Sequence, residues 1–469
     1  MRPFFTMLLF LLVCCSSSFA QSSPNNFDIT LDKKAKEVYA AACGENGFCV
    51  VTETQSRKIH QAKIIHADTS MHALWDTTLN LSQDWLLQQV FYEDNTLVIL
   101  CRWRQNKRFT DKMTIFLYNL ISKKWESRDI AGLPAIDALT NWHHYRGNLF
   151  FTSLSQYGDN VWYLPAGFSE PFPFTFTREN RGKLLTTAVD TAQGCAIICF
   201  NSGGRTMYFE TDFSGKSSFA NMINEAASGA HWTSVGRNHS MLMLYHQDDD
   251  SFYMHPVNIL NHLVMPSETV YYADIAVPKT LPNKSQKAEL IIVAPHNYTR
   301  FYPTQVTLVN GRLACVTELY YPEYSNYFNG WYLESRFDGY RYERADVHFF
   351  DTNGVFLTNV SFPYAETVSL RTTVYRVLNV SGFENGDVLL YTLGGYEFST
   401  MLLDSLCRLK SPVSTMDIPI RRASAAGQYK VVPVAMQPWY DNRFLLTAYK
   451  VQLGSQRKLG YLVKKLEYY

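Results

Sequence analysis

The chain has 469 residues, and its 43 Lys and Arg residues almost balance its 42 Asp and Glu residues, which leaves a formal net charge of +1. Charged residues make up only 18% of the sequence. Recognition of nucleic-acid phosphates needs a strongly basic face, so this balance argues against a nucleic-acid partner. A hydrophobic content of 46% and an aromatic content of 15% instead suit a folded protein rich in β-sheet.

Residues 1–20 have the features of a cleaved signal peptide. Arg2 supplies a positive charge, residues 4–13 form an apolar run, and Ser18-Phe19-Ala20 provides the small residues that precede a cleavage site. The sequence therefore predicts export to the periplasm, the cell surface or the medium, with a mature chain that starts near Gln21.

Two features bear on membrane attachment. Cys14-Cys15 raises the alternative of a lipoprotein, but Val13 stands where lipid attachment requires a small residue. After the signal there is no second run of roughly eighteen apolar residues, the length that a membrane-spanning helix needs. We therefore expect no lipid anchor and no transmembrane segment.

The two ends of the mature chain both resemble strands. Residues 21–26 are polar and form a predicted flexible leader, whereas residues 27–31 alternate apolar and polar side chains with the period of a half-buried strand. The chain ends on another apolar stretch, residues 461–469. Pairing of these ends would remove two free sheet edges, which otherwise invite aggregation. We expect the first and last strands to pair.

A repeated phrase runs between these ends: a tight polar turn, four to six apolar residues, and later a second short apolar run. Successive turns lie 46–52 residues apart in the first half of the chain and further apart in the second, and such a period built from short strands indicates radially repeated sheets. The apolar runs follow turns at Gly47, Asn95, Gly147, Gly194, Ser240, Gly311, Gly386 and Asn442. The partner runs are residues 113–118, 161–164, 206–210, 251–254, 345–350, 400–403 and 459–463.

This recurrence resembles the β-propeller architecture from residue 27 to residue 469. A single four-stranded sheet cannot bury both of its faces, whereas a ring of such sheets buries all of them. We therefore predict an all-β fold: one propeller domain, residues 27–469, of seven to eight four-stranded antiparallel blades, with eight favoured. No blade has the motif of a named subfamily, since the Trp-Asp ending is missing and Gly394-Gly395-Tyr396 is similar to a kelch blade only once. The chain is similar to uncharacterised exported propeller-like proteins of bacterial cell envelopes.

Two stretches interrupt the repeat. Residues 217–230 place Ala and Met residues at near-helical spacing, which suggests a short surface helix between blades. Residues 278–287 have the composition of an exposed loop, and the apolar residues 290–293 after it are predicted to form a buried strand.

Seven cysteines remain after the signal, so at least one thiol is expected to be free. Cys43 and Cys49 flank a turn that could bring them opposite each other, and we consider a disulfide between them. Cys195 and Cys199 lie on one face of a strand, too far apart to bond, and are predicted to be buried apolar residues. There is no CxxC pair, so no structural zinc site is expected. The seven are Cys43, Cys49, Cys101, Cys195, Cys199, Cys315 and Cys407.

An aromatic-rich insertion at residues 320–342 is the most unusual local feature. Rigid rings with polar tips give a large contact area at low entropic cost, as in many binding surfaces. The insertion either packs on itself and caps the ring or holds a glycan, peptide or protein ligand. The candidate ligand-binding residues are Tyr324, Tyr327, Trp331, Tyr332, Arg336, Tyr340 and Arg341.

The same segment supplies carboxylates for a catalytic alternative. Glycoside hydrolysis needs two carboxyl groups several ångströms apart on either side of a bond. Glu318, Glu323, Glu334 and Asp338 are the candidates if the protein is a glycan-active hydrolase or lyase.

Other polar motifs carry weaker signals. His143 and His144 are adjacent, so on a strand they point to opposite faces and do not chelate a metal together. Residues 102–109 and 248–250 are interpreted as hairpin tips, and Gln193-Gly194-Cys195 is like the approach to a catalytic thiol but opens a blade strand. With no serine-hydrolase elbow, zinc-protease helix or phosphate-binding glycine loop, the sequence gives no reason to expect a cofactor or a metal.

The sequence thus predicts an exported, non-enzymatic binding or scaffold propeller that recognises a glycan, peptide or protein through one face of the ring. The alternative is a glycan-active hydrolase or lyase with acidic and tyrosyl residues in the central funnel, and the oligomeric state is left open.

Overall fold

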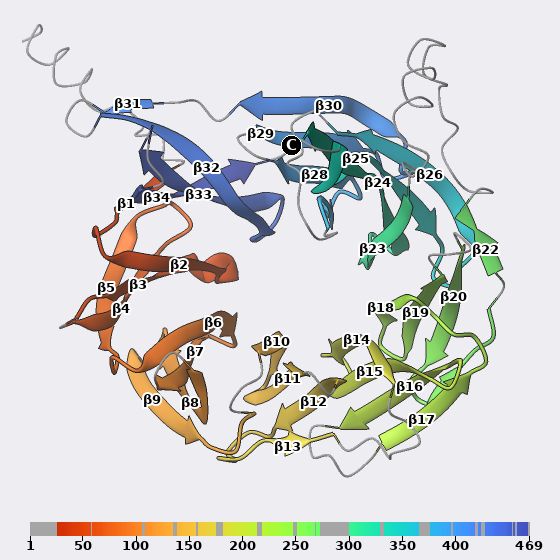
Figure 1. The fold of residues 1–469 in the computed structure, drawn as a ribbon, viewed down its shortest axis with the longest axis horizontal. Coiled ribbons are helices and arrows are strands. Elements are labelled where there is room, and N and C mark those ends of the chain that lie inside the picture. Colours follow the sequence, from red (N-terminus) through yellow and green to blue (C-terminus); the bar gives the residue numbers. More distant parts are fainter. Residues whose placement is uncertain are drawn as a thin grey trace, which may run out of the picture.

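The computed structural model describes a closed ring of antiparallel sheets (Figure 1). The described residues are 26–57, 59–105, 108–134, 138–155, 158–174, 182–212, 218–246, 251–267, 269–272, 300–328, 333–364, 376–394, 397–417, 421–423, 427–452, 454 and 457–467. The strand order gives eight sheets, and this confirms the favoured blade count of the predicted β-propeller.

Each blade is built from four strands that are consecutive in the chain, the last blade excepted. Blades 1 to 4 consist of β2 (Ala35–Ala42), β3 (Phe48–Gln55), β4 (His60–Ala67) and β5 (Ala73–Asn80); β6 (Trp85–Glu93), β7 (Thr96–Gln105), β8 (Arg108–Asn119) and β9 (Lys124–Ile130); β10 (Ala138–Tyr145), β11 (Asn148–Ser155), β12 (Gly158–Leu164) and β13 (Phe172–Pro173); and β14 (Lys183–Asp190), β15 (Cys195–Ser202), β16 (Arg205–Asp212) and β17 (Ser218–Ile223). Blades 5 to 7 consist of β18 (Gly229–Gly236), β19 (His239–His246), β20 (Ser251–Asn258) and β21 (Leu263–Val264), with β22 (Thr269–Tyr271) also on β20; β23 (Arg300–Val309), β24 (Arg312–Phe328), β25 (Leu333–Phe350) and β26 (Phe356–Pro363); and β27 (Leu378–Gly382), β28 (Val388–Gly394), β29 (Glu397–Leu403) and β30 (Leu409–Asp417).

Blade 8 closes the ring with strands from both ends of the chain. It contains β32 (Gly427–Pro438), β33 (Arg443–Gln452) and β34 (Lys458–Glu467), with the short β31 (Arg421–Ala423) on β32. Its remaining strand is β1 (Asn26–Thr30), which pairs antiparallel with β34 from Asn26↔Lys464 to Thr30↔Gly460. The predicted pairing of the two ends is confirmed, and the strand begins at Asn26, within the segment expected to be a leader.

The hydrophobic core lies between the blades. Eight apolar clusters account for the eight junctions, each formed by two neighbouring blades. Alternate residues of one strand serve different junctions: Val50 packs against blade 8, whereas Val51 packs against blade 2. A strand buried on both faces needs apolar residues at every position, which explains the continuous apolar runs in the sequence.

Gly47 shows how closely two blade elements approach at one of these turns. Its φ is +95°, and a Cβ atom there would lie 1.9 Å from the carbonyl oxygen of Ala67. Only glycine fits this position. The indole Nε1 of Trp439 donates to the Gly47 carbonyl oxygen at 2.7 Å and so fastens blade 8 to blade 1 at the ring closure.

Two expectations from the sequence are wrong. Within the stretch expected to be a helix, residues 218–223 form β17, the outer strand of blade 4, and residues 229–230 begin β18. Pairing with β16 satisfies the backbone of β17, whereas an isolated helix of this length is marginal in water. Cys43 and Cys49 are both buried thiols that no disulfide joins, and the strand register places Cys49 opposite Ala41. Cys199 is buried and Cys195 partly buried in one junction cluster, as expected.

Several predictions concern residues outside the described ranges. These are the signal peptide, the strand at residues 290–293 and the turn at residues 248–250. Among the described residues, no helix is long and apolar enough to cross a membrane.

Candidate functional site

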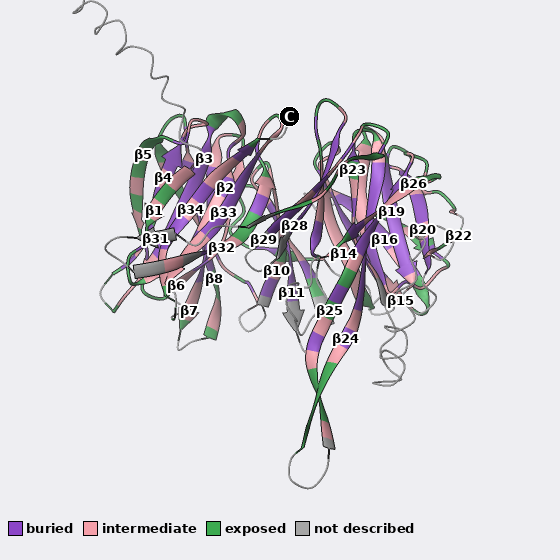
Figure 2. Cartoon of the chain, turned by 90° about the horizontal axis from the view of Figure 1, so that it is seen from above, coloured by how far each residue is buried: buried purple, intermediate pink, exposed green. Residues whose placement is uncertain are grey.

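The aromatic insertion is a continuation of two strands of blade 6. β24 has 17 residues and β25 has 18, whereas the corresponding strands of blade 4, β15 and β16, have 8 each. Figure 2 shows the two strands leaving the ring as a twisted ribbon that changes from buried to exposed toward its tip. We call residues 321–328 and 333–343 the arm.

The arm begins where the neighbouring strands of the blade stop. β23 pairs with β24 as far as Arg300↔Tyr320, and β26 pairs with β25 as far as Arg344↔Pro363. Beyond these points, the strand pairing seen among the described residues is between β24 and β25 alone, and it continues to Phe328↔Leu333. The arm is therefore a two-stranded ribbon outside the four-stranded blade.

A ladder of aromatic rings runs from the blade into the arm. Ring centroids are 6.4 Å apart for Tyr302 and Tyr320, 5.2 Å for Tyr320 and Tyr340, 5.1 Å for Tyr340 and Phe337, and 5.5 Å for Phe337 and Tyr324. Exposure rises along the ladder, from 2% for Tyr320 to 36% for Phe337 and 44% for Tyr324. The rings thus stiffen the base of the arm and present apolar surface further out.

Polar side chains make cross-strand pairs along the same ribbon. Arg341 donates to both carboxylate oxygens of Glu323, at 2.8 and 3.0 Å. Ser325 donates to Asp338 at 3.0 Å, and the Tyr327 hydroxyl donates to Glu334. These three pairs hold the two strands together and occupy all three arm carboxylates proposed as catalytic.

The tip of the arm is the most exposed part. Phe328 is 69% exposed and Tyr327 46%. Arg336 is also exposed, opposite Ser325. Trp331 and Tyr332 lie outside the described residues.

Glu318 lies at a different place from the other predicted carboxylates. It is fully buried in β24, where its Oε1 accepts from the backbone N–H groups of Val377 and Leu378 at 2.9 Å each and its Oε2 accepts from the Tyr364 hydroxyl. Burial raises the pKa of this carboxyl group to about 7, against the opposing effect of its three donors. Glu318 therefore joins blade 6 to the start of blade 7 and is not part of a surface site.

The predicted binding residues and three of the predicted catalytic carboxylates lie on the same ribbon. Tyr324, Tyr327, Arg336, Tyr340 and Arg341 share the arm, as a binding surface requires. Glu323, Glu334 and Asp338 all belong to one ribbon of one blade and point to partners within it. Each of the three therefore accepts from a donor of its own ribbon, an arrangement that holds the two strands of the arm together.

The other polar motifs serve the ring. His144 lies 2.5 Å from Glu93 of blade 2, and His143 lies 3.5 Å from Thr187 of blade 4, so the adjacent histidines do face opposite neighbours. Arg102 is fully buried and lies over the Phe109 ring at 4.4 Å, rather than at a solvated hairpin tip. Within the described ranges, no group of three or more His, Cys, Asp or Glu residues is placed to hold a metal ion.

Comparisons with known proteins agree with a divergent sequence. No family model matches the chain, and no curated protein matches it. Among solved structures, it is similar to the WD40 domain of SCAP from fission yeast, with 9% identity over 96% of this chain and 97% of that one and a TM-score of 0.40. It is also similar to the β-propeller domain of the Trilobed protease from Pyrococcus furiosus (9% identity, 83% and 96% covered, TM-score 0.38) and to that of Nup133 from Vanderwaltozyma polyspora (9%, 81% and 99%, TM-score 0.41).

These likenesses concern the fold alone. These propeller domains belong to differently named proteins, one of them a protease, so no activity passes to this chain from them. The chain is a β-propeller with eight divergent blades, and its strand order establishes this independently of any relative.

Proposed function

We propose that this protein is an exported, non-enzymatic binding propeller that docks a protein partner with the arm. The main support is the exposure of the arm's aromatic side chains. Tyr324, Tyr327 and Phe328 are 44%, 46% and 69% exposed on a ribbon outside the ring. Large aromatic residues dominate the energetics of protein interfaces because they bury much area and lose little entropy. Export rests on residues 1–20 alone.

The backbone of the arm supports a polypeptide rather than a glycan as the partner. A two-stranded ribbon is marginally stable by itself in water, and its outer edges are templates for another strand. A partner strand that pairs with such an edge gains backbone hydrogen bonds, while exposed side chains on alternate positions supply specificity. Sugars lack the regular row of donors and acceptors that this edge would match.

Shortening the arm tests the proposal. A variant in which an Asn-Gly turn replaces residues 322–340 joins Tyr321 to Arg341, which pair directly across the ribbon, so the ring is expected to fold unchanged. We expect the full chain to co-purify from its own host with a stoichiometric protein partner that the shortened variant does not retain. Both forms should unfold cooperatively, because the deleted residues lie outside the two junction clusters of blade 6.

A photo-crosslinker gives the matched control. Placed at Tyr324 it should capture the same partner in one discrete product, whereas placed at Leu406, 53% exposed on the ring, it should not. Retention of the partner by the shortened variant, or equal capture from both positions, would contradict the proposal.

A further inference from the structure

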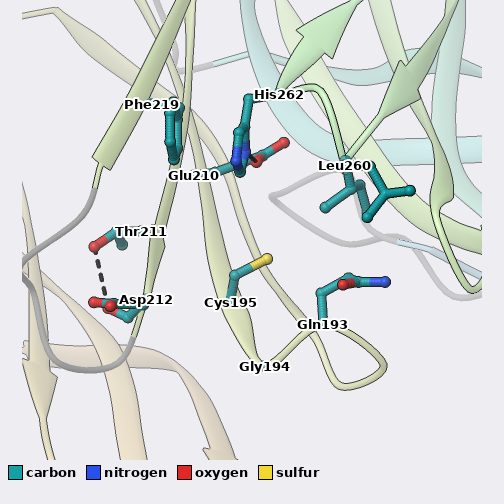
Figure 3. A pocket seen from close by; sticks show the side chains of 10 residues that line it. Gln193, Gly194, Cys195, Glu210, Thr211, Asp212, Phe219, Leu260 and His262 are labelled. Atoms are coloured by element: carbon teal, nitrogen blue, oxygen red, sulfur yellow. Dashed lines mark hydrogen bonds and ion pairs between the residues drawn. The ribbon is translucent and has the colours of Figure 1, made fainter.

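A cavity of about 250 Å³ opens between blades 4 and 5, away from the arm. It lies at the end of the ring that holds the first turn of each blade, whereas the arm tip extends the second turn of blade 6 and so leaves from the opposite end. Its walls are the turn before β15, the end of β16, Phe219 of β17 and the turn after β20 (Figure 3). We call this cavity the inter-blade cleft.

His262 forms one wall and is held in a single orientation. Its ring stacks on Phe219 with a centroid separation of 3.4 Å and an interplanar angle of 7°, and its Nδ1 lies 2.6 Å from Glu210 Oε2. Asn221 fixes the backbone by donating to the His262 carbonyl oxygen at 2.9 Å. In the neutral imidazole this contact places the proton on Nδ1, and Nε2 is then a hydrogen-bond acceptor.

Glu210 supports His262 from inside the blade. It is only 3% exposed, and its Oε1 accepts from the Tyr208 hydroxyl at 2.8 Å. The Tyr208, Glu210 and His262 chain therefore crosses from blade 4 to blade 5 with its geometry fixed before any ligand arrives.

Cys195 faces the cleft but does not make it a thiol-dependent catalytic site. Figure 3 shows its Sγ directed into the space between His262, Leu260 and Gln193. Burial, with the negative charges of Asp190 and Glu210, raises the pKa of the thiol to about 12. A nucleophilic cysteine needs the opposite shift, because the thiolate is the reactive form. The cleft is therefore suited to binding.

The polar groups of the cleft are mainly acceptors. They include the carboxylate of Asp212 and Nε2 of His262, and neither Lys nor Arg contributes to the walls. The Gln193 amide nitrogen already donates to the carbonyl oxygen of Arg237, which leaves its oxygen as a further acceptor. A matching ligand must supply several donors and no negative charge.

The remaining walls are apolar and come from Phe219, Ile259 and Leu260. A pyranose combines the two matching kinds of surface: hydroxyl donors around its edge and apolar C–H groups on its faces. The volume lies just below the usual range of small-molecule pockets, roughly 300–1,000 Å³, and so suits one ring rather than a chain of them. We infer that the inter-blade cleft binds a single neutral sugar unit, with His262 and Asp212 accepting from its hydroxyls.

A cationic side chain is the competing ligand for an acceptor-rich cleft. Glu210 is only 3% exposed and both of its oxygens already accept hydrogen bonds, so it offers no direct contact to an added ammonium or guanidinium group. The gain for a cation in a cleft open to solvent is also reduced by screening. A neutral polyol uses the acceptors without relying on net charge.

Ligand-observed NMR on the full chain tests the inference. The probes are the methyl α-pyranosides of glucose, galactose and mannose, with glucuronic acid as the anionic comparison and agmatine as the cationic one. We expect saturation transfer to at least one neutral glycoside, no transfer to glucuronic acid, and at least tenfold weaker binding in Asp212→Asn.

A blocking variant separates this cleft from other surfaces. Leu260 is 63% exposed, so Leu260→Trp should fold and fill the cleft, whereas Leu263→Trp, at a position 47% exposed and outside the cleft walls, serves as the matched control. Neutral glycoside binding should be lost in the first and kept in the second. Binding that survives Leu260→Trp, a preference for agmatine, or no response to any neutral glycoside would overturn the inference. None of these outcomes depends on the arm.

Discussion

Blades 4 and 6 follow the same four-stranded plan, yet only blade 6 extends beyond the ring. The second strand of blade 4, β15, pairs with β16 along its full length and ends with the blade. The second strand of blade 6, β24, is buried from Leu313 to Tyr320 and then becomes exposed from Tyr324 to Phe328. Burial stops where the neighbouring strands of the blade stop. The first half of β24 therefore stabilises the ring, and the second half is exposed for contacts outside the ring.

The largest expected effect comes from two phenylalanines of the same strand. Phe349 of β25 is fully buried between blades 6 and 7, whereas Phe337 of the arm is 36% exposed. Truncation of a buried Phe leaves a cavity and costs about 3–5 kcal/mol, so Phe349→Ala should lower the free energy of unfolding by that amount. Phe337→Ala should cost less than about 1.5 kcal/mol, the value of an aromatic pair.

Urea denaturation measures both variants. Because a repeat ring need not unfold in one step, coincident transitions by fluorescence and circular dichroism are the control for a two-state analysis. Equal destabilisation by the two substitutions would show that the arm belongs to the cooperative folding unit and would remove the distinction between the halves of β24.

Glu318 marks the last buried polar position before the arm. Glu318→Ala leaves the N–H groups of Val377 and Leu378 without their acceptor, and each buried unsatisfied group costs about 1–3 kcal/mol. We expect a loss of about 2–5 kcal/mol in unfolding free energy. Glu318→Gln keeps an acceptor oxygen and the side-chain shape, so it should cost clearly less. Similar losses in both variants would show that charge, and not the two hydrogen bonds, is what this position supplies.

The raised pKa of Glu318 predicts that the stability of the fold depends on pH. Its folded pKa of about 7 lies above the ordinary value of 4.5, so between these values the folded chain binds the proton more tightly than the unfolded chain. The contribution to stability is therefore complete below pH 4.5 and is lost as the pH rises through about 7, to an extent of a few kcal/mol at most. The difference in unfolding free energy between the wild-type chain and Glu318→Gln should change across this window. A constant difference from pH 4 to pH 8 would contradict the raised pKa.

The ring was predictable from the sequence because its cause is local in the chain. Residues such as Val50 and Val51 must both be apolar when each faces a different blade, and that requirement appears as an uninterrupted apolar run. Closure by the first strand follows from the same logic, since the alternation at residues 27–31 leaves one face to cover.

The sites were less predictable because they depend on contacts between distant residues. The tilted contact between the Tyr324 and Phe337 rings depends on a strand register that includes a bulge beside Glu323. The sequence shows no such register, so it indicates only an insertion at this position. The cleft joins Glu210 to His262 across two blades, and no local pattern relates them. Neither burial nor partner could be assigned to Glu318 without the position of blade 7.

The smallest expected effect tests whether the arm is held by charge or by its rings. The Glu323 and Arg341 side chains are 31% and 46% exposed, and solvent-exposed ion pairs contribute about 0–1 kcal/mol. Glu323→Gln should therefore leave the unfolding temperature of the ring unchanged. Phe337→Ala should change it only slightly, because its cost in unfolding free energy is less than about 1.5 kcal/mol. Hydrogen exchange of the arm amides distinguishes the two, since loss of Phe337 removes contacts to both Tyr324 and Tyr340 and should raise exchange throughout the outer ribbon. If Glu323→Gln instead produced the larger increase, the polar pairs would be the element that keeps the arm extended, and its docking would become sensitive to salt.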